Sequence, residues 1–374
     1  MSSQKGYELL KKSPLFNLSL ASKELFHSNF IQWYGHTFPE RFGEIIRILI
    51  NKGTESLVVK HIDREKENID LLIHCELSGA KFTVVVENKV KSIPSNEQLN
   101  KYAKKVKADA YLLLTFVKPL KELPSPWKLV PYPAFLSQLC TEKYDSCDSS
   151  GYYQAIVKDY KDFTQALFDL VNHILNGERY FHDDCKQLKY LRIDDLIGKG
   201  QAFSVAQMLY LEYPDGVFGP GQKIPGKIYI EHSFSNTEPM VSLYQCFESS
   251  EGEPCYFAGV QVQHGNIRIC GYAPCANSKD RRAEKFMNFL CTDVWDDLSD
   301  YQGARNRRQN PYCVLYYQYN INNVGMFLYK EKPLENYSTI TKAALADEIN
   351  MIFKFVTNNK AEIERKIRSG EFSN

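Results

Sequence analysis

Residues 68–91 read NIDLLIHCELSGAKFTVVVENKVK, and this stretch decides the fold of the first half of the chain. Its two apolar runs predict strands over residues 69–77 and 81–90. The dipeptide Ser78-Gly79 between them is a signal for a two-residue hairpin turn. The stretch therefore predicts an antiparallel hairpin, which fixes the residues that face each other across the two strands.

Folding the hairpin about that dipeptide brings two acidic side chains together. Asp70 lies opposite Glu87, and strand alternation puts Lys89 on the same face, two residues further along. Directly opposed residues of an antiparallel pair point to the same side, with Cβ atoms about 5 Å apart. Two anions at that separation repel each other. A shared proton, a basic side chain between them or a hard divalent cation would relieve the repulsion.

A magnesium ion suits this set because carboxylate oxygens are its protein ligands, with waters and substrate phosphate completing its shell. A lysine beside it can orient or deprotonate a water and stabilise charge on phosphorus. The alternative is a surface hairpin with a ladder of Glu–Lys salt bridges. Against that alternative, Glu87 follows Val84-Val85-Val86, a run typical of a buried strand.

The order Asp70, hairpin, Glu87-Asn88-Lys89 resembles the signature of the PD-(D/E)XK nuclease superfamily. The context resembles its uncharacterised "PD-(D/E)XK nuclease" branch over residues 15–175. In that branch a helix with a Glu-x-x-His-Ser pattern and a later Trp precedes the hairpin, and Gln-Leu-x-x-Tyr follows it. Here these patterns read ELFHS at 24–28 with Trp33, and QLNKY at 98–102.

The sequence departs from the family pattern in two places. Ile69 precedes the aspartate where the family name has proline, and residues 34–36 read YGH where the branch has a Leu-Leu run. The second departure leaves the end of the first helix open. Neither one touches the expected metal ligands.

The resemblance implies a role for each residue of the hairpin. Asp70 and Glu87 would bind Mg²⁺ (or Mn²⁺), with the backbone carbonyl of Asn88 as a further ligand. Lys89 would position the attacking water and the scissile phosphate. Glu24 would supply an acid from the preceding helix. Glu44 is its rival, because it lies off the apolar stripe of its own helix, and Glu24 is favoured.

Three further side chains have two interpretations each. His27 shares a helix face with Glu24 and supports the site, or it is a capping or core histidine. Gln98 approaches the lysine and the phosphate, closes a capping box with Ser95, or does both. Tyr102, one turn later, touches nucleic acid or packs.

The remaining pattern predicts two domains. Residues 1–178 read as an α/β domain, a restriction-endonuclease-like mixed sheet flanked by helices. Residues 179–374 read as an α+β domain with an antiparallel sheet that selects substrates or binds partners.

Expected helices cover 22–34, a segment from Pro39, 95–107, 152–175, two pieces within 191–209, 280–298 and 339–368. Further strands are expected at 57–61 and 111–117 and within KIYIEH, VSLYQCF, CYFAGVQVQ, IRICGYA and YCVLYYQYN, and the proline-rich segment 119–133 reads as a surface connection or an edge.

Composition narrows the function classes. The content is 44% hydrophobic and 13% aromatic, typical of a folded protein, and no apolar run approaches the length of a membrane span. A net charge of +1 argues against a broad coating of nucleic acid but allows a local basic groove. The lysines at 89, 91, 101, 104, 105 and 107 form such a rim or a solvated helix face.

These observations predict a metal-dependent endonuclease whose partner is nucleic acid, DNA before RNA, in defence against foreign DNA by family analogy. An RNA or structure-specific nuclease and a catalytically silent binding module are the alternatives. The segment MSSQKGYELLKKS lacks the apolar stretch of a signal peptide, so a cytoplasmic protein with reduced cysteines is expected. A membrane partner is not expected, and a homodimer is left open.

Overall fold

The computed structural model describes residues 3–13, 15–16, 24–90, 96–119, 122–139, 151–180, 185–219, 224–235, 238–248, 255–263, 265–274, 281–296, 298, 301–303, 313–319 and 323–372. The chain divides into two compact units. Unit 1 comprises residues 1–177 and 184–197, and unit 2 comprises residues 178–183 and 198–374.

Unit 1 is built on a five-stranded mixed sheet, as the sequence predicts. Its strands follow the chain in the order β1-β2-β3-β4-β5; the first three are antiparallel, and β3, β4 and β5 are parallel. The bounds are β1 Leu57–Lys66, β2 Ile69–Leu77, β3 Ala80–Lys89, β4 Ala110–Thr115 and β5 Trp127–Pro131. The proline-rich segment thus supplies the edge strand, a position at which proline is tolerated.

The β2–β3 hairpin has the predicted turn and register. Ser78 and Gly79 have φ values of 50° and 85°, the left-handed pair that a tight two-residue turn needs. The strands pair from Leu77 with Ala80 to Leu71 with Val86. Continuing this register by one residue sets Asp70 opposite Glu87, so the geometric argument from the sequence is confirmed up to the last paired residues.

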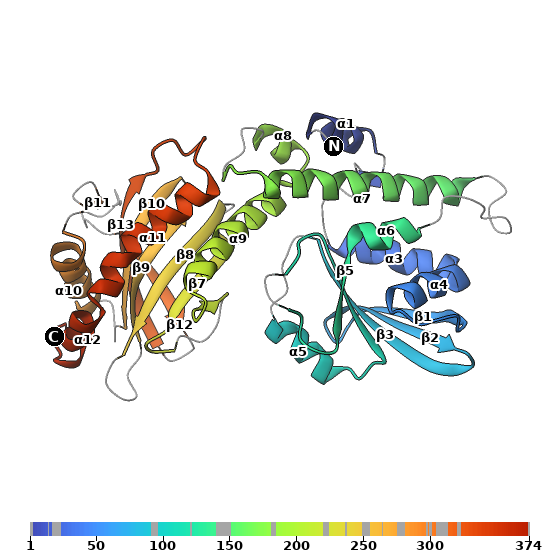
Figure 1. Ribbon diagram of the computed structural model, residues 1–374, viewed down its shortest axis with the longest axis horizontal. Helices are drawn as coiled ribbons and strands as arrows, with labels where there is room; N and C mark the ends of the chain where they lie inside the picture. The colour runs from blue at the N-terminus through green and yellow to red at the C-terminus, as the bar shows by residue number, and fades with distance from the viewer. Residues whose placement is uncertain are drawn as a thin grey trace. The chain divides into compact units, whose positions relative to one another are not determined.

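Helices cover both faces of this sheet, and α1 packs on α7 instead of on the strands (Figure 1). The helices of unit 1 are α1 Ser3–Lys12, α3 Glu24–Thr37, α4 Pro39–Leu49, α5 Asn96–Lys105, α6 Tyr132–Gln138, α7 Tyr152–Asn176 and α8 Cys185–Tyr190. Alternate residues of β3, Val84 and Val86, pack with α3, α4, α6 and α7 in the larger core. Val85 faces the other way and packs with Leu99 of α5. By strand alternation Glu87 and Lys89 therefore lie on the α5 face, and Asn88 lies on the opposite face.

Unit 2 contains an eight-stranded sheet in the order β11-β13-β10-β9-β8-β7-β6, with β12 also paired to β13. All its pairings are antiparallel except that of β6 with β7. The bounds are β6 Val217–Phe218, β7 Ile228–Ser235, β8 Glu238–Phe247, β9 Tyr256–Gln263, β10 Asn266–Pro274, β11 Gln302–Gly303, β12 Cys313–Tyr319 and β13 Asn323–Pro333. The sequence analysis missed β13, which pairs with three other strands.

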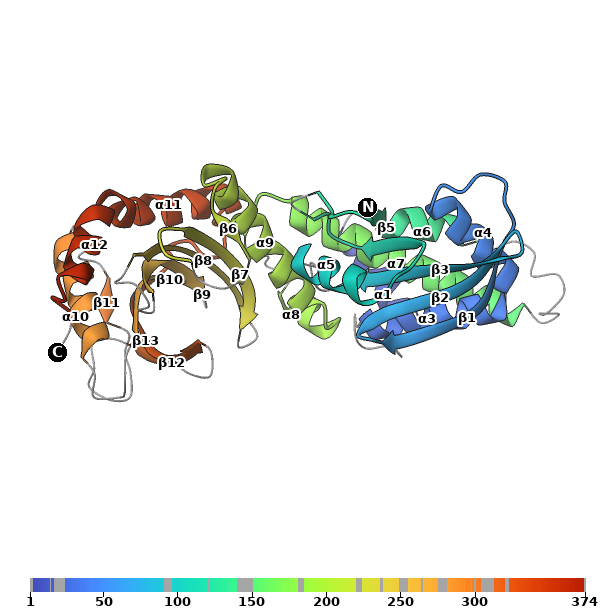
Figure 2. The same cartoon turned by 90° about the horizontal axis from the view of Figure 1, so that it is seen from below.

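The helices of unit 2 are α9 Asp194–Glu212, whose first residues belong to unit 1, α10 Arg282–Phe289, a π-helical turn Leu290–Val294, α11 Lys342–Asn358 and α12 Lys360–Arg368. The expected pair of short helices within 191–209 is wrong in its bounds, because α9 runs unbroken for 19 residues. Figure 2 shows α11 lying along the outer side of the curled sheet. None of the helices in the described ranges is long and apolar enough to cross a membrane.

Candidate active site

The polar residues of the hairpin gather where β2 begins and β3 ends. Glu87 is 1% exposed and Lys89 is 8% exposed, while Asp70 is half-buried. The backbone N–H of Asn88 donates to Oδ2 of Asp70 over 2.7 Å. This bond continues the contact between the strands beyond the last regular pair, and it fixes one oxygen of Asp70 beside the backbone that carries Glu87 and Lys89.

Glu87 and Lys89 form a buried ion pair, with 2.7 Å between Lys89 Nζ and Glu87 Oε1. Of the three arrangements that could relieve charge repulsion, the structure therefore shows a basic side chain on one of the acids. Taking two charges out of water costs several kcal/mol per ion, which attraction offsets only in good geometry. A surface ladder of salt bridges is excluded, since both side chains are almost fully enclosed.

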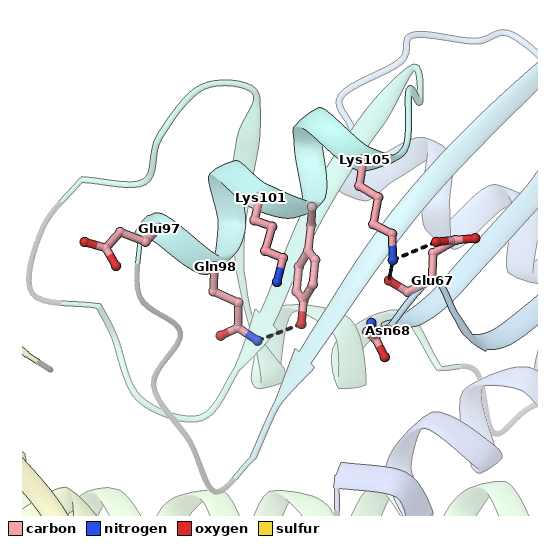
Figure 3. A pocket seen from close by; sticks show the side chains of 7 residues that line it. Glu67, Asn68, Glu97, Gln98, Lys101 and Lys105 are labelled. Atoms are coloured by element: carbon pink, nitrogen blue, oxygen red, sulfur yellow. Dashed lines mark hydrogen bonds and ion pairs between the residues drawn. The ribbon is translucent and has the colours of Figure 1, made fainter. Parts of the chain in front are cut away.

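Helix α5 brings two further polar groups to the same place. Gln98 Nε2 lies 3.5 Å from Oε1 of Glu87 and donates to the Tyr102 hydroxyl over 2.8 Å (Figure 3). The one-turn spacing that the sequence shows thus places both side chains on the helix face that meets the carboxylate. The capping partner expected for Gln98, Ser95, lies outside the described residues.

The side chain of Asn88 points to the other face of the sheet, where it is fully buried. Its Oδ1 accepts from the Tyr132 hydroxyl over 2.6 Å, and its Nδ2 donates to Ser28 Oγ over 3.0 Å. Ser28 comes from α3 and Tyr132 from α6. Because a buried amide needs partners for its donor and its acceptor, these contacts hold the end of β3 in one position.

His27, beside Ser28 on α3, is 1% exposed and lies with Nδ1 3.0 Å from the hydroxyl of Tyr160. Its ring is packed among Phe26, Phe116, Tyr132, Tyr160 and Phe163. Burial lowers the pKa of His27 to about 3, so the imidazole is neutral near pH 7. These contacts agree with the core-histidine interpretation.

The two candidates for the helix-borne acid differ in what the structure describes. Glu24 begins α3, but its side chain lies outside the described part of the chain. Glu44 is 64% exposed on α4, 3.9 Å from Arg47. Its helix α4 packs, like α3, on the core opposite α5, away from the face that carries Glu87. Glu44 makes no described contact with the hairpin acids, and the choice between Glu24 and Glu44 stays a prediction.

The donor set agrees with the chemistry of a hard cation. Mg²⁺ is bound through one or two carboxylates and keeps waters and phosphate oxygens as its other ligands. Asp70 and Glu87 supply two such carboxylates from adjacent strands. Within the described ranges no group of three or more His, Cys, Asp or Glu side chains could hold a metal ion. The residues therefore fit a cation that shares its shell with the substrate rather than one enclosed by protein ligands.

Comparison with family models supports the resemblance. Residues 46–131 match the model of the PD-(D/E)XK nuclease superfamily, 86 of the 374 residues of the chain. The matched stretch begins within α4, ends with β5 and contains the hairpin and α5. Comparison with curated proteins and with solved structures gave no match. The mixed α/β fold and the matched family together indicate a nuclease-type phosphodiesterase.

One part of the site was missed by sequence reasoning. Asn88 was considered only for its backbone carbonyl, whereas its side chain ties β3 to the helices behind it. Tyr132 was not considered at all, because it stands in the ordinary apolar segment VPYPAFL, where nothing marks a polar role. Ser28 belongs to the Glu-x-x-His-Ser pattern, and its hydroxyl accepts the hydrogen bond from Asn88 that helps to hold the end of β3.

Proposed function

We propose that this protein is a metal-dependent endonuclease that hydrolyses phosphodiester bonds in DNA, with its site on the α5 face of the β2–β3 hairpin. The observation that carries the proposal is the enclosed pair of Glu87 and Lys89 beside Asp70. Buried charges are costly, and perturbed charged groups cluster at functional sites. The family match over the same residues points in the same direction.

The chemistry divides among the named side chains. Asp70 and Glu87, with the Asn88 carbonyl, would hold Mg²⁺ or Mn²⁺, which would supply positive charge to the scissile phosphate and the attacking water. Lys89 carries a positive charge in an enclosed site, where it stabilises charge that develops on phosphorus. Gln98 orients Glu87 and the water through its amide. Glu24 would add an acid from the start of α3.

DNA as the polymer, and defence against foreign DNA as the process, rest on the family resemblance. The cytoplasm is the proposed compartment, and a homodimer is left open. The proposed chemistry depends on neither. Residues 179–374 are proposed to form the domain that selects the substrate or binds a partner.

The test is cleavage of labelled DNA and RNA by purified protein with Mg²⁺ or Mn²⁺. We expect cleavage of DNA, its loss in EDTA, and its loss by at least about a hundredfold in Asp70→Asn, as for removal of one electrostatic group in an active site. Glu76→Gln is the matched control, an exposed carboxylate of the same hairpin paired with Lys60. Equal cleavage by Asp70→Asn and Glu76→Gln contradicts the proposal.

A second variant guards against loss of fold. Replacing Glu87 by Gln together with Lys89 by Met removes both buried charges and keeps side-chain volume, a change that is often neutral for stability. We expect this double variant to be folded by circular dichroism and inactive. Titration with Mn²⁺ by calorimetry should show binding to the wild type and none to the double variant.

A further inference from the structure

A cavity of about 450 Å³ adjoins the candidate site (Figure 3). It lies between the β1–β2 turn and α5 and is lined by Glu67, Asn68, Glu97, Gln98, Lys101, Tyr102 and Lys105. Gln98 and Tyr102 belong to both places, since Gln98 also reaches Glu87. Gln98 therefore connects the cavity to Glu87, although neither hairpin carboxylate lines the cavity itself.

The wall of the cavity is fixed by the β1–β2 turn. Lys66 pairs with Ile69, and the two residues between them, Glu67 and Asn68, have φ values of 59° and 63°. Lys105 Nζ holds this turn against α5, at 2.6 Å from Glu67 Oε2 and 3.1 Å from the Glu67 carbonyl. The lysine also lowers the pKa of Glu67, which keeps the pair ionised. These contacts join the turn to α5 along one side of the cavity.

The lining contains two lysines and two glutamates, and one lysine and one glutamate form an ion pair with each other. Lys105 is neutralised by Glu67, whereas exposed Lys101 makes no ion pair with any described residue. Figure 3 shows Glu97 directed away from Lys101, toward the beginning of α5. Lys101 can therefore take a single phosphate group, while the remaining lining is formed by two amides, a phenol, the Glu67–Lys105 pair and the Glu97 carboxylate, which is directed away from Lys101.

This combination matches the parts of one nucleotide. The volume lies within the range of about 300–1,000 Å³ that ligand pockets take, and it is far larger than a phosphate alone requires. Asn68 and Gln98 can donate to and accept from the edge of a base, Tyr102 offers an aromatic ring, and Lys101 offers a charge for the backbone. A base that is stacked and paired within a duplex cannot enter such a pocket, because it must first leave the stack.

We propose that this cavity holds one unpaired nucleotide next to the bond that is cut, so that the preferred substrate is DNA that is single-stranded at the cleavage position. The proposal rests on the nuclease function proposed above. Tyr102 stacks on the base of this nucleotide. Lys101 binds a neighbouring phosphate of the strand, while Lys89 acts on the phosphate of the bond that is cut.

The experiment measures binding in EDTA, where no cleavage occurs. The probe is a fluorescein-labelled oligothymidylate about 20 nucleotides long, which exceeds the site size of about 4–16 nucleotides found for single-strand binding folds. Anisotropy should show tighter binding of this strand than of its duplex with oligodeoxyadenylate. Tyr102→Ala should weaken single-strand binding by about tenfold, and Tyr102→Phe, which keeps the ring, by much less.

Lys101→Ala should reduce the slope of log K against log salt concentration by about 0.7, the value for one phosphate contact on a single strand. Lys104→Ala is the matched control. Lys104 lies on the same helix, is exposed and does not line the cavity, so its replacement should leave the slope nearly unchanged. Equal slopes for the two variants overturn the proposal, as does a Tyr102→Ala protein that binds like the wild type.

These results are separable from a failure of the nuclease function. If DNA is cut in an Asp70-dependent manner but duplex and single strand bind and react equally, only the nucleotide pocket is wrong. If no nucleic acid is cut under any condition, the nuclease function is wrong, and the binding data in EDTA still decide whether the cavity takes an unpaired nucleotide.

Discussion

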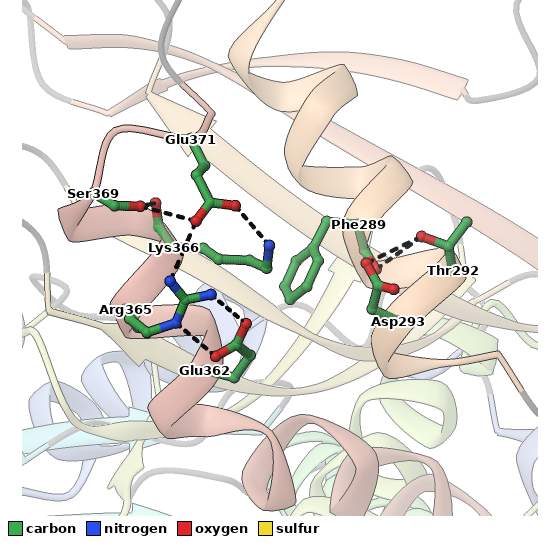
Figure 4. Close-up of polar contacts among 8 residues, drawn as sticks. All are labelled: Phe289, Thr292, Asp293, Glu362, Arg365, Lys366, Ser369 and Glu371. Carbon is green, nitrogen blue, oxygen red and sulfur yellow. Dashed lines mark hydrogen bonds and ion pairs between the residues drawn. The ribbon is translucent and has the colours of Figure 1, made fainter.

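Two clusters of ion pairs, one in each unit, have nearly the same distances but different surroundings. At the end of β3, Lys89 lies 2.7 Å from Glu87, with side chains 10% and 1% exposed. Around α12, Arg365 lies 2.7 Å from Glu362 and Lys366 lies 2.6 Å from Glu371 (Figure 4). The exposed fractions of the Arg365 and Glu362 side chains are 58% and 45%.

The distance between two charges therefore does not by itself show how much an ion pair contributes to stability. Exposed pairs are solvated in either state and contribute little to stability. Buried pairs lose solvation, so removing one partner leaves a charge without compensation. The ion pairs around α12 lie at the surface and link this helix to Glu371. The buried Glu87–Lys89 pair on β3 costs solvation free energy, and a functional role of its charges would explain why the pair is present. Four sets of substitutions, given in order of decreasing effect, test how burial determines the contribution of a charged or polar group.

Lys89→Ala should lower the free energy of unfolding by about 3–5 kcal/mol in EDTA, because the Glu87 carboxylate is left buried without its cation. Urea denaturation followed by circular dichroism measures the change. On the proposed function, Mg²⁺ should restore part of the loss by replacing the missing positive charge. A loss below about 1 kcal/mol would show that this buried pair contributes no more to stability than an exposed pair, contrary to the prediction.

Asn88→Ala should cost about 2–4 kcal/mol, because the hydroxyls of Tyr132 and Ser28 each lose a buried partner. Tyr132→Phe removes one of the two bonds and should cost about 1–2 kcal/mol. If Asn88 positions the end of β3, the catalytic rate constant should fall in both variants while the affinity for DNA in EDTA stays close to that of the wild type. A parallel loss of DNA affinity would argue against a positioning role.

His27 is a buried group whose protonation should affect the pH dependence of stability. Its pKa is about 3 in the folded protein against an ordinary value of 6.5, so between these pH values the unfolded chain binds a proton that the folded chain does not. Stability therefore falls as the pH falls through this window, by about 1.4 kcal/mol per pH unit. From pH 6.5 to pH 5 the expected loss is about 2 kcal/mol. Melting curves of His27→Leu should lack this part of the pH dependence, and identical pH dependences would contradict it.

Arg365→Ala should have the smallest effect. Its guanidinium is exposed and pairs with Glu362 and Glu371 at the surface. We expect no measurable change in the urea midpoint at about 1 M NaCl, where the Debye length is about 3 Å, and at most a small one at low salt. A large loss that persists at high salt would show that exposure is the wrong criterion for separating the two clusters.

Much of unit 1 could be predicted from local signals. Ser78-Gly79 fixed the turn, the turn fixed the register, and the register brought Asp70 to Glu87. The four-residue spacing of Gln98 and Tyr102 put both on one face of α5. These steps succeed because turn chemistry and element periods are properties of neighbouring residues.

The remainder depends on contacts between distant segments. β13 begins with Asn323 and contains Gly325, both disfavoured in strands, yet it is held by pairing with β10, β11 and β12. Two short helices were expected within 191–209, but α9 continues through Gly198 and Gly200 because Ala202, Val205 and Leu209 are buried in the core of unit 2. The contact between Asn88 and Tyr132 joins residues 44 apart and left no trace in the sequence pattern.

The two faces of β3 have consequences for how this chain can change. The amide of Asn88 fastens one face to α3 and α6, so substitutions there disturb the acids on the other side of the strand. The cavity beside α5 is built from a turn and one helix face, and neither contributes to that attachment. Substitutions at Asn68 and Lys101 should therefore alter what the cavity binds while the hairpin acids keep their positions, whereas a substitution at Tyr102 would also remove the partner of Gln98.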